Sequence, residues 1–324
     1  MTVVALVALR VGLGFHFFYE GVWKIRHADE FSAEPFLTQA KGPAAPVFYG
    51  MIPDLNGRER LAVVKEKDES GKEIDVVTTE AIAQEWERLR KQFVSHYGRT
   101  EEEKKRLGEA SAKIYKTHLE MLKAYFKENL ADIKGYFNSL DRFEHNKEAG
   151  QDAPFQSERR WNEMMKLRAE AKKWLVQREV ATENFEQALL GLRNDEQKAR
   201  GPLPFNFNVF TWDRVSQINL AVTFGLTAIG LCLILGFFTR LAALGGAAFM
   251  CFVVATQPAF PTIYPPDPAV VGHALLINKD FIELLSLLVI ATTAVGRWGG
   301  LDYFLHTLIL DPILSRRMRN SKND

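Results

Sequence analysis

Residues 3–24 read VVALVALRVGLGFHFFYEGVWK. The stretch is mostly apolar and long enough to cross a bilayer, whose hydrocarbon core of about 30 Å needs about 20 residues of α-helix. It also carries His16, Glu20 and Lys24 at intervals of four residues, which places the three side chains on one face of a helix. Ionisable groups within a membrane span are energetically costly, so this face is the first candidate for a functional site.

The alternative for this stretch is a cleaved signal peptide. A signal peptide has an uninterrupted apolar region followed by a cleavage site of small residues. Arg10 interrupts the apolar region here, and no site of that kind follows. We therefore predict that residues 1–25 form a retained transmembrane helix.

Three later runs are also apolar enough to span a bilayer. They cover residues 216–238, 241–257 and 280–297, and the last two are short for the purpose. Glycine and alanine recur in them, which favours close helix packing in lipid. The predicted fold class is therefore an all-α membrane protein with a four-helix transmembrane bundle, made of residues 1–25 and 215–300. Residues 301–324 are predicted to form an amphipathic cytoplasmic tail.

Charged residues are concentrated between the first and second apolar runs. The chain has 41 basic and 40 acidic residues, and they crowd into residues 58–200. This balance, without a basic groove interleaved with aromatic residues, excludes nucleic acid as a predicted partner. Cys232 and Cys251 lie in apolar runs and form neither a CxxC motif nor a disulfide framework, so we expect them to be packing residues.

Lysine and arginine mark the predicted cytoplasmic side. Arg240 lies in the tight connection between the second and third spans, Arg297 ends the fourth, and the tail SRRMRNSK at 315–322 is strongly basic. Short basic connections stay in the cytoplasm, whereas long domains are translocated regardless of charge. We predict a multi-pass protein of the cell (inner) membrane, with both termini cytoplasmic and residues 26–214 extracytoplasmic.

The extracytoplasmic insertion is predicted to be mostly helical. Residues 60–78 alternate around a Ser-Gly turn and predict a small β-hairpin. A long antiparallel helical hairpin of coiled-coil type is predicted near 100–200, with its turn between Gly150 and Pro154. The first of its helices shows apolar residues at intervals of three and four: Tyr115, Leu119, Leu122, Phe126, Ile133, Phe137 and Leu140. The second shows a less pure pattern that includes polar residues: Trp161, Met165, Arg168, Lys172, Leu175, Thr182, Phe185, Leu189 and Leu192. The hairpin is either a solvated spacer or a platform on which an extracytoplasmic partner docks along residues 110–195.

The apolar runs also resemble a known family. RVGLGFHFFYEGVWKI at 10–25, LGFFTRLAALGGA at 235–247 and NKDFIELLSLLVIATTAVGRWGGLD at 278–302 together resemble the DoxX/DoxD-like membrane proteins. The resemblance implies a four-helix membrane bundle. It also implies a place in a membrane redox complex, because the family includes the DoxD subunit of a thiosulfate:quinone oxidoreductase. The large charged insertion departs from the compact family pattern.

Polar residues of the four predicted spans are expected to meet near the outer ends of the helices. His16, Glu20 and Glu283 are the predicted proton-handling residues of this outer layer, and Lys24, Gln217, Gln257 and Lys279 are its predicted cofactor-binding residues, with His273 just outside. The competing interpretation is that Lys24 and Lys279 only extend to the interface, as long basic side chains do. A carboxylate has too short a stem for that, so Glu20 and Glu283 are the stronger candidates.

The sequence limits the chemistry of this layer. It contains no dinucleotide fingerprint, haem-attachment motif, cysteine cluster or zinc motif, so no metal site and no encoded cofactor is predicted. Histidine titrates near neutral pH, and beside carboxylates it can exchange protons with a quinone head group. The first hypothesis is a subunit of a quinone-linked oxidoreductase whose partner protein supplies the redox centre. The alternative is a non-enzymatic membrane anchor whose outer hairpin recruits a partner, and a small-solute transporter is a third.

Overall fold

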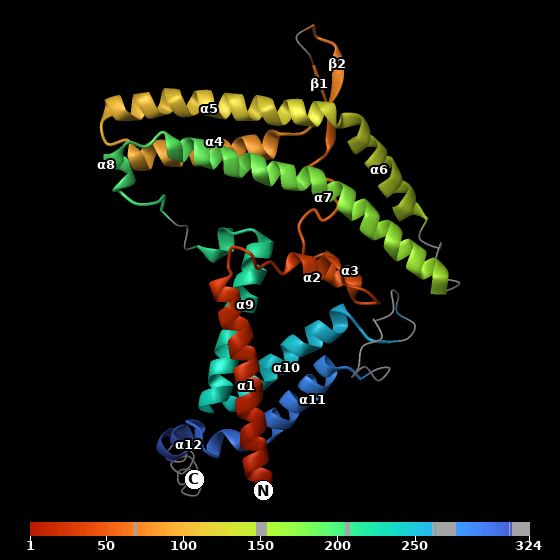
Figure 1. Ribbon diagram of the computed structural model, residues 1–324, viewed down its shortest axis with the longest axis vertical. Coiled ribbons are helices and arrows are strands. Elements are labelled where there is room, and N and C mark those ends of the chain that lie inside the picture. Colours follow the sequence, from red (N-terminus) through yellow and green to blue (C-terminus); the bar gives the residue numbers. More distant parts are fainter. Residues whose placement is uncertain are drawn as a thin grey trace, which may run out of the picture. The chain divides into compact units, whose positions relative to one another are not determined.

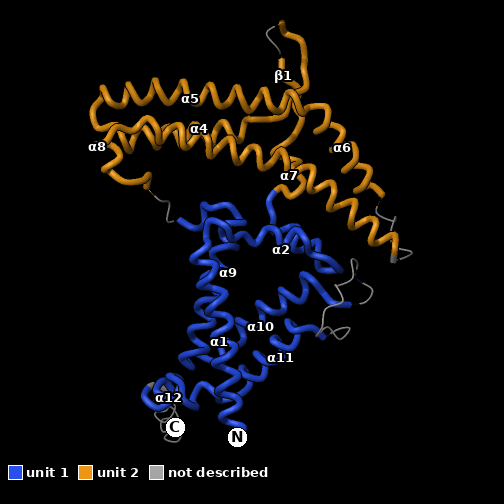
Figure 2. Tube along the Cα trace, viewed as in Figure 1, with its two compact units in different colours: residues 1–53, 208–324 blue, residues 54–207 orange. Residues whose placement is uncertain are grey.

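The computed structural model is mainly helical (Figure 1) and describes residues 1–67, 70–146, 154–204, 208–260, 263, 277–310 and 312. The chain forms two compact units (Figure 2). Unit 1 comprises Met1–Pro53 and Asn208–Asp324, and unit 2 comprises Asp54–Phe207. The predictions for Gly150, for His273 and for the basic tail at 315–322 lie outside the described residues.

Unit 1 contains three helices that are long and apolar enough to cross a membrane. They are α1 (Thr2–Arg26), α9 (Arg214–Leu235) and α10 (Thr239–Thr256) (Figure 1). Only 17% to 39% of the residues in their apolar windows are buried inside the chain. Apolar helices exposed to this extent need lipid or another apolar partner around them. The mostly helical fold predicted from the sequence is confirmed, and three of the predicted spans have the length and composition of membrane helices.

The predicted fourth span, 280–297, is not one continuous helix. α11 (Lys279–Thr292) has 14 residues, or about 21 Å, which is short of the ~30 Å hydrocarbon core. The hydroxyls of Thr292 and Thr293 donate to the carbonyls of Leu288 and Ile290, and Thr293 is already extended. The chain continues through the 3-10 helix η2 (Val295–Arg297), α12 (Asp302–Leu305) and the π-helical turn η3 (His306–Leu310). The described residues thus contain three helices of spanning length.

α1 and α9 approach each other closely because glycine residues line their contact. A Cβ atom at Gly230 would lie 2.2 Å from the backbone nitrogen of Phe18, and one at Gly21 would lie 2.3 Å from Thr227 Oγ1. Gly14 meets the backbone of α9 in the same way, with Ile234 N at 2.8 Å from its Cβ position. Helices in lipid associate mainly through such backbone packing. The glycines therefore fix how α1 is rotated against α9.

Residues 27–53, which fall within the predicted insertion 26–214, belong to unit 1. They include α2 (Glu34–Thr38) and α3 (Ala45–Tyr49). Asn219 Oδ1 accepts a hydrogen bond of 2.8 Å from the backbone N–H of Ala33. The N–H of Lys41 donates to the carbonyl of Thr256 over 2.9 Å, at the end of α10. Residues of α9 and α10 thereby hold this segment at one end of the helices.

Unit 2 begins with the β-hairpin that the sequence predicts near 60–78. β1 (Val63–Lys67) and β2 (Glu73–Val77) pair antiparallel, with Val63 opposite Val77. The helices that follow are α4 (Glu80–Tyr97), α5 (Glu101–Glu128), α6 (Leu130–His145), α7 (Pro154–Gly191) and the short α8 (Asp195–Lys198). α4, α5 and α7 contact one another along their lengths, and α7 also packs on α6 (Figure 1).

Two features of unit 2 differ from the predicted pair of helices near 100–200. The first is an additional helix, α4, which precedes the predicted pair. Its buried residues are Ile82, Trp86, Phe93 and Tyr97, and this short apolar stripe does not stand out in a polar segment. The second is a break between α5 and α6 at Asn129, whose Nδ2 donates to the carbonyl of Tyr125 over 2.8 Å. Such a side-chain bond competes with the helical ladder.

The core of unit 2 is aromatic and lies between α4 and α7. Trp86 is fully buried and stacks on Phe185, with ring centroids 4.7 Å apart. Its Nε1 donates to Thr182 Oγ1 over 3.0 Å, so the polar end of the indole is satisfied. Unit 2 thus has a hydrophobic cluster of its own, separate from that of unit 1.

Gly230→Ala is expected to destabilise unit 1, because the added Cβ would overlap the backbone of α1. Overpacking of this kind costs about 1–3 kcal/mol, or roughly 2–12 °C in Tm. The measurement is thermal unfolding of the full chain in detergent. Gly225→Ala on the same helix is the matched control, because nothing lies within 4 Å of its Cβ position. Equal melting temperatures for the two variants would contradict the glycine contact.

Candidate polar site on α1 and α11

The predicted polar face of α1 carries an ion pair. Lys24 Nζ donates to Glu20 Oε2 over 2.8 Å, and Lys24 also lies 5.3 Å from the ring centroid of Phe31. The side chain of Lys24 is 14% exposed and that of Glu20 is 46% exposed. Lys24 is therefore covered by protein, whereas a lysine that only extends to the interface would be free of such contacts.

Glu283 is the carboxylate with an unusual environment. It lies on α11, which packs on α10 and also contacts α1. His16, Glu20, Lys279 and Asp280 are within electrostatic range of it. Its Oε1 is buried and has no hydrogen-bond partner among the described residues. Buried polar atoms almost always have a partner, because an unpaired one costs about 1–3 kcal/mol, so this oxygen requires an explanation.

The start of α11 fixes the position of Glu283. Asn278 is buried and caps the helix, since its Oδ1 accepts a hydrogen bond of 2.9 Å from the N–H of Phe281. Leu284 and Leu287 are buried in the hydrophobic cluster of unit 1. A side chain adjacent to this buried face is held against the bundle, and Glu283 is therefore half-buried without a charged neighbour in hydrogen-bond contact.

The structure brings together only part of the predicted outer layer. His16, Glu20 and Glu283 are mutual electrostatic neighbours, with Lys24 bonded to Glu20 and Lys279 close to both carboxylates. Gln217 instead donates from Nε2 to the carbonyl of Trp212 over 2.9 Å, within its own helix start. Gln257 ends α10, and no side-chain contact joins it to the cluster in the part of the chain that the structure describes. The candidate site therefore lies on α1 and α11.

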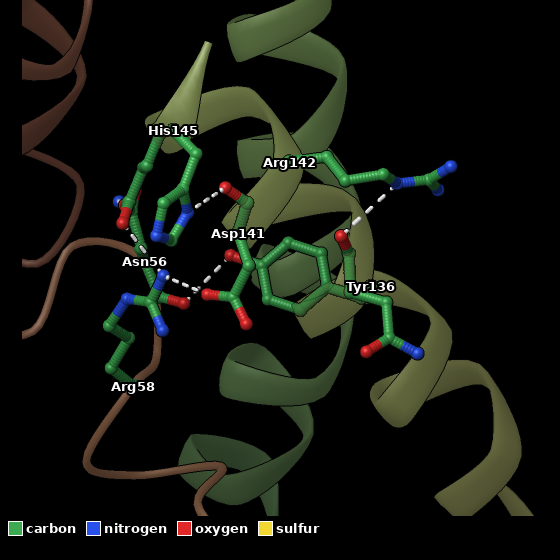
Figure 3. A network of polar contacts seen from close by, with 8 residues as sticks. Asn56, Arg58, Tyr136, Asp141, Arg142 and His145 are labelled. Carbon is green, nitrogen blue, oxygen red and sulfur yellow. Dashed lines mark hydrogen bonds and ion pairs between the residues drawn. The ribbon is translucent and has the colours of Figure 1, made fainter. Parts of the chain in front are cut away.

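A second polar network lies in unit 2 (Figure 3). Arg58 forms ion pairs of 2.7 Å with both Asp141 and Glu144, and the hydroxyl of Tyr136 donates to the carbonyl of Asn56 over 2.7 Å. The hydrogen bond to Asp141 raises the pKa of Arg58, and burial raises the pKa of Tyr136 well above its ordinary value. All these groups satisfy one another, so the network is a brace between the start of unit 2 and α6.

Arg58→Gln is expected to loosen the segment 54–62, because Arg58 joins it to two carboxylates on α6. The measurement is hydrogen–deuterium exchange of the full chain, in which amides of 54–62 should exchange severalfold faster while those of α5 are unchanged. Lys65→Gln is the control, since its ion pair with Glu73 is 3.4 Å long and exposed on both sides. Unchanged protection of 54–62 would rule out the brace.

Arg10 is a buried charge whose partners the sequence did not identify. Its Nη1 donates to the carbonyl of Val295 over 3.1 Å and its Nη2 to that of Gly299 over 3.2 Å. Asp302 lies within electrostatic range of Arg10 and accepts hydrogen bonds from the N–H groups of Phe238 and Thr239, of 2.7 and 2.9 Å. The sequence offers only the motifs Thr239-Arg240 and Gly300-Leu301-Asp302 as a signal for this site. Their separation in the sequence does not indicate that they meet in the fold.

Comparison with known proteins does not place the chain in a family. No protein-family model, no curated protein and no solved structure matches it.

Proposed function

We propose that the chain is a membrane subunit of a quinone-linked redox complex, similar to the DoxX/DoxD-like proteins. Glu283, with His16 and Glu20, exchanges protons with the quinone head group. A partner protein supplies the electron carrier, because the sequence contains no motif for one.

The observation that carries this proposal is the unpaired, buried Oε1 of Glu283. A quinone carbonyl is a hydrogen-bond acceptor, and a protonated carboxyl group is a donor, so the two groups are complementary. His16 and Glu20 lie within electrostatic range of Glu283, and histidine exchanges protons near neutral pH. Phe17, Phe249 and Phe281 belong to the hydrophobic cluster of the same unit, which suits an apolar ring.

We further propose that α1, α9 and α10, with α11 and its extension to Arg297, form a four-span bundle. Arg240 and Arg297 then lie on the cytoplasmic side, and unit 2 lies outside the membrane. The short length of α11 is compatible with a span in a bundle, because local thinning of the bilayer and the following residues make up the difference.

Cysteine labelling tests this topology. Cys232 and Cys251 are first replaced by serine, because they are the two cysteines of the chain. Lys123→Cys in α5, which is exposed, should react in intact cells with a membrane-impermeant maleimide. Arg240→Cys should react only after the cells are opened. Labelling of both positions from outside, or of Arg240→Cys alone, would contradict the proposed orientation.

Glu283→Leu is expected to weaken binding of decylubiquinone to the detergent-purified chain by about tenfold, the loss of one hydrogen bond involving a carboxyl group. Glu283→Gln should weaken it less, because the amide can still donate. Quinone-dependent turnover of the complex should nevertheless fall in Glu283→Gln, since an amide does not transfer the proton.

Glu30→Gln is the matched control, since it removes an exposed carboxylate just beyond α1. Its quinone affinity and turnover should equal those of the unaltered chain. If the chain is instead an anchor whose outer unit recruits a partner, the Glu283→Leu substitution should leave quinone affinity unchanged. Unchanged quinone affinity and turnover in both Glu283 variants would therefore exclude the redox proposal.

A further inference from the structure

A cavity of about 490 Å³ lies where the connection between α9 and α10 meets α12. Two arginines, Arg240 and Arg297, line it, together with His306 and the apolar side chains of Phe238, Leu241 and Leu305. The cavity is near Arg10, which precedes Glu20 by ten residues on α1, or about 15 Å of helix. It is therefore distinct from the candidate quinone site.

The charge of this cavity is positive. Asp302 is the acidic residue in its wall, but its two oxygens already accept the N–H groups of Phe238 and Thr239, and Arg10 lies in electrostatic range of it. Arg240 donates from Nε to the carbonyl of Thr293 over 3.3 Å. No described carboxylate forms an ion pair with Arg240 or Arg297. Two guanidinium charges thus remain uncompensated within the described wall.

Two further donors point to an anion. Thr239 is 1% exposed and lines the cavity, and its Oγ1 has no hydrogen-bond partner among the described residues. Thr239 also begins α10, an 18-residue helix whose N-terminal end carries a partial positive charge. The first ladder bond there is from Ala242 N to Phe238 O, so the N–H groups of Arg240 and Leu241 precede the ladder. Arginine, hydroxyl and helix N–H groups together are the donors that bind phosphate.

The apolar surroundings favour a lipid over a soluble phosphate. Phe238 is 52% exposed and Leu241 is 69% exposed, although both line the cavity. Tyr303, Phe304 and Leu308 beside it are also more than half exposed. Side chains of this kind cover acyl chains, while the arginines take the head group.

We propose that this cavity binds the phosphodiester head group of an anionic phospholipid. Arg240 and Arg297 contact the phosphate oxygens, the hydroxyl of Thr239 donates to one of them, and the acyl chains lie along Phe238 and Leu241. The lipid thereby joins the α9–α10 connection to α12.

The test measures lipid binding by the delipidated full chain in detergent, using native mass spectrometry and thermal stabilisation. Phosphatidylglycerol should bind at least about tenfold more tightly than phosphatidylcholine, and Arg240→Gln combined with Arg297→Gln should remove about tenfold or more of that affinity. Arg26→Gln removes an exposed positive charge from the last turn of α1 and is the matched control. It should bind phosphatidylglycerol as the unaltered chain does.

Thr239→Val separates binding from folding. The substitution keeps the shape of the side chain and removes a buried unpaired hydroxyl, so the chain without lipid should melt at the same temperature or higher. Stabilisation by phosphatidylglycerol should nevertheless fall severalfold. Undiminished stabilisation would overturn the role of Thr239.

Measurements with inorganic phosphate and with phosphatidylcholine distinguish the possible ligands. Inorganic phosphate at millimolar concentration should neither stabilise the chain nor displace phosphatidylglycerol. If it does both, the site takes a soluble phosphate and the lipid assignment is overturned. Equal binding of phosphatidylcholine and phosphatidylglycerol, or full binding by the double arginine variant, would overturn the anion site itself. These readouts do not involve Glu283 or quinone, so the result is independent of the proposed redox function.

Discussion

The backbone contact between α1 and α9 is the constraint on which unit 1 depends. Gly14, Gly21 and Gly230 allow the two helices to touch, and this close approach replaces the hydrophobic drive that lipid does not provide. It sets the rotation of α1, so that Arg10, Gly14, Phe17 and Gly21 form the buried stripe. Once that stripe is fixed, the face with His16, Glu20 and Lys24 has to lie beside it, towards α11.

The same rotation places two polar groups of α1 in very different environments. Arg10 is turned into the connection that follows α11, where Gly236 and Gly300 leave space for its guanidinium group, since a Cβ at either position would lie 2.3 or 2.6 Å from Nη1. Glu20 is only half-buried and is paired with Lys24. One helix therefore supports a buried charge near one end and a partly exposed ion pair near the other, and both depend on the glycine contact.

The sequence predicted those parts of the fold that depend on local pattern. Long apolar runs predicted α1, α9 and α10 because composition decides membrane compatibility, and alternation around a Ser-Gly turn predicted the β-hairpin. It did not predict α4, which buries only Ile82, Trp86, Phe93 and Tyr97 in a polar helix, or the end of α11 at Thr292. In the candidate site the helical spacing of four placed His16, Glu20 and Lys24 on one face, and the predicted outer layer already included Glu283. That layer also included Gln217, whose side chain bonds within its own helix start instead, because local pattern does not determine how each side chain is turned. The contact of Arg10 with residues 295–299 spans almost the whole chain, and no local pattern encodes it.

Arg10 and Glu283 are two ionisable groups of unit 1 whose hydrogen bonding differs. Both lie in apolar helices, where a charge is expensive. Arg10 donates from two of its nitrogens to the carbonyls of Val295 and Gly299, while its Nε is buried without a partner among the described residues, so the guanidinium group links α1 to the connection that follows α11. Glu283 has a buried oxygen without a described partner, and Lys279 as well as the like charges of Glu20 and Asp280 lies within electrostatic range of it. A buried carboxylate oxygen that no neighbour satisfies is the feature on which the proposed ligand contact rests, because buried polar atoms are normally hydrogen-bonded.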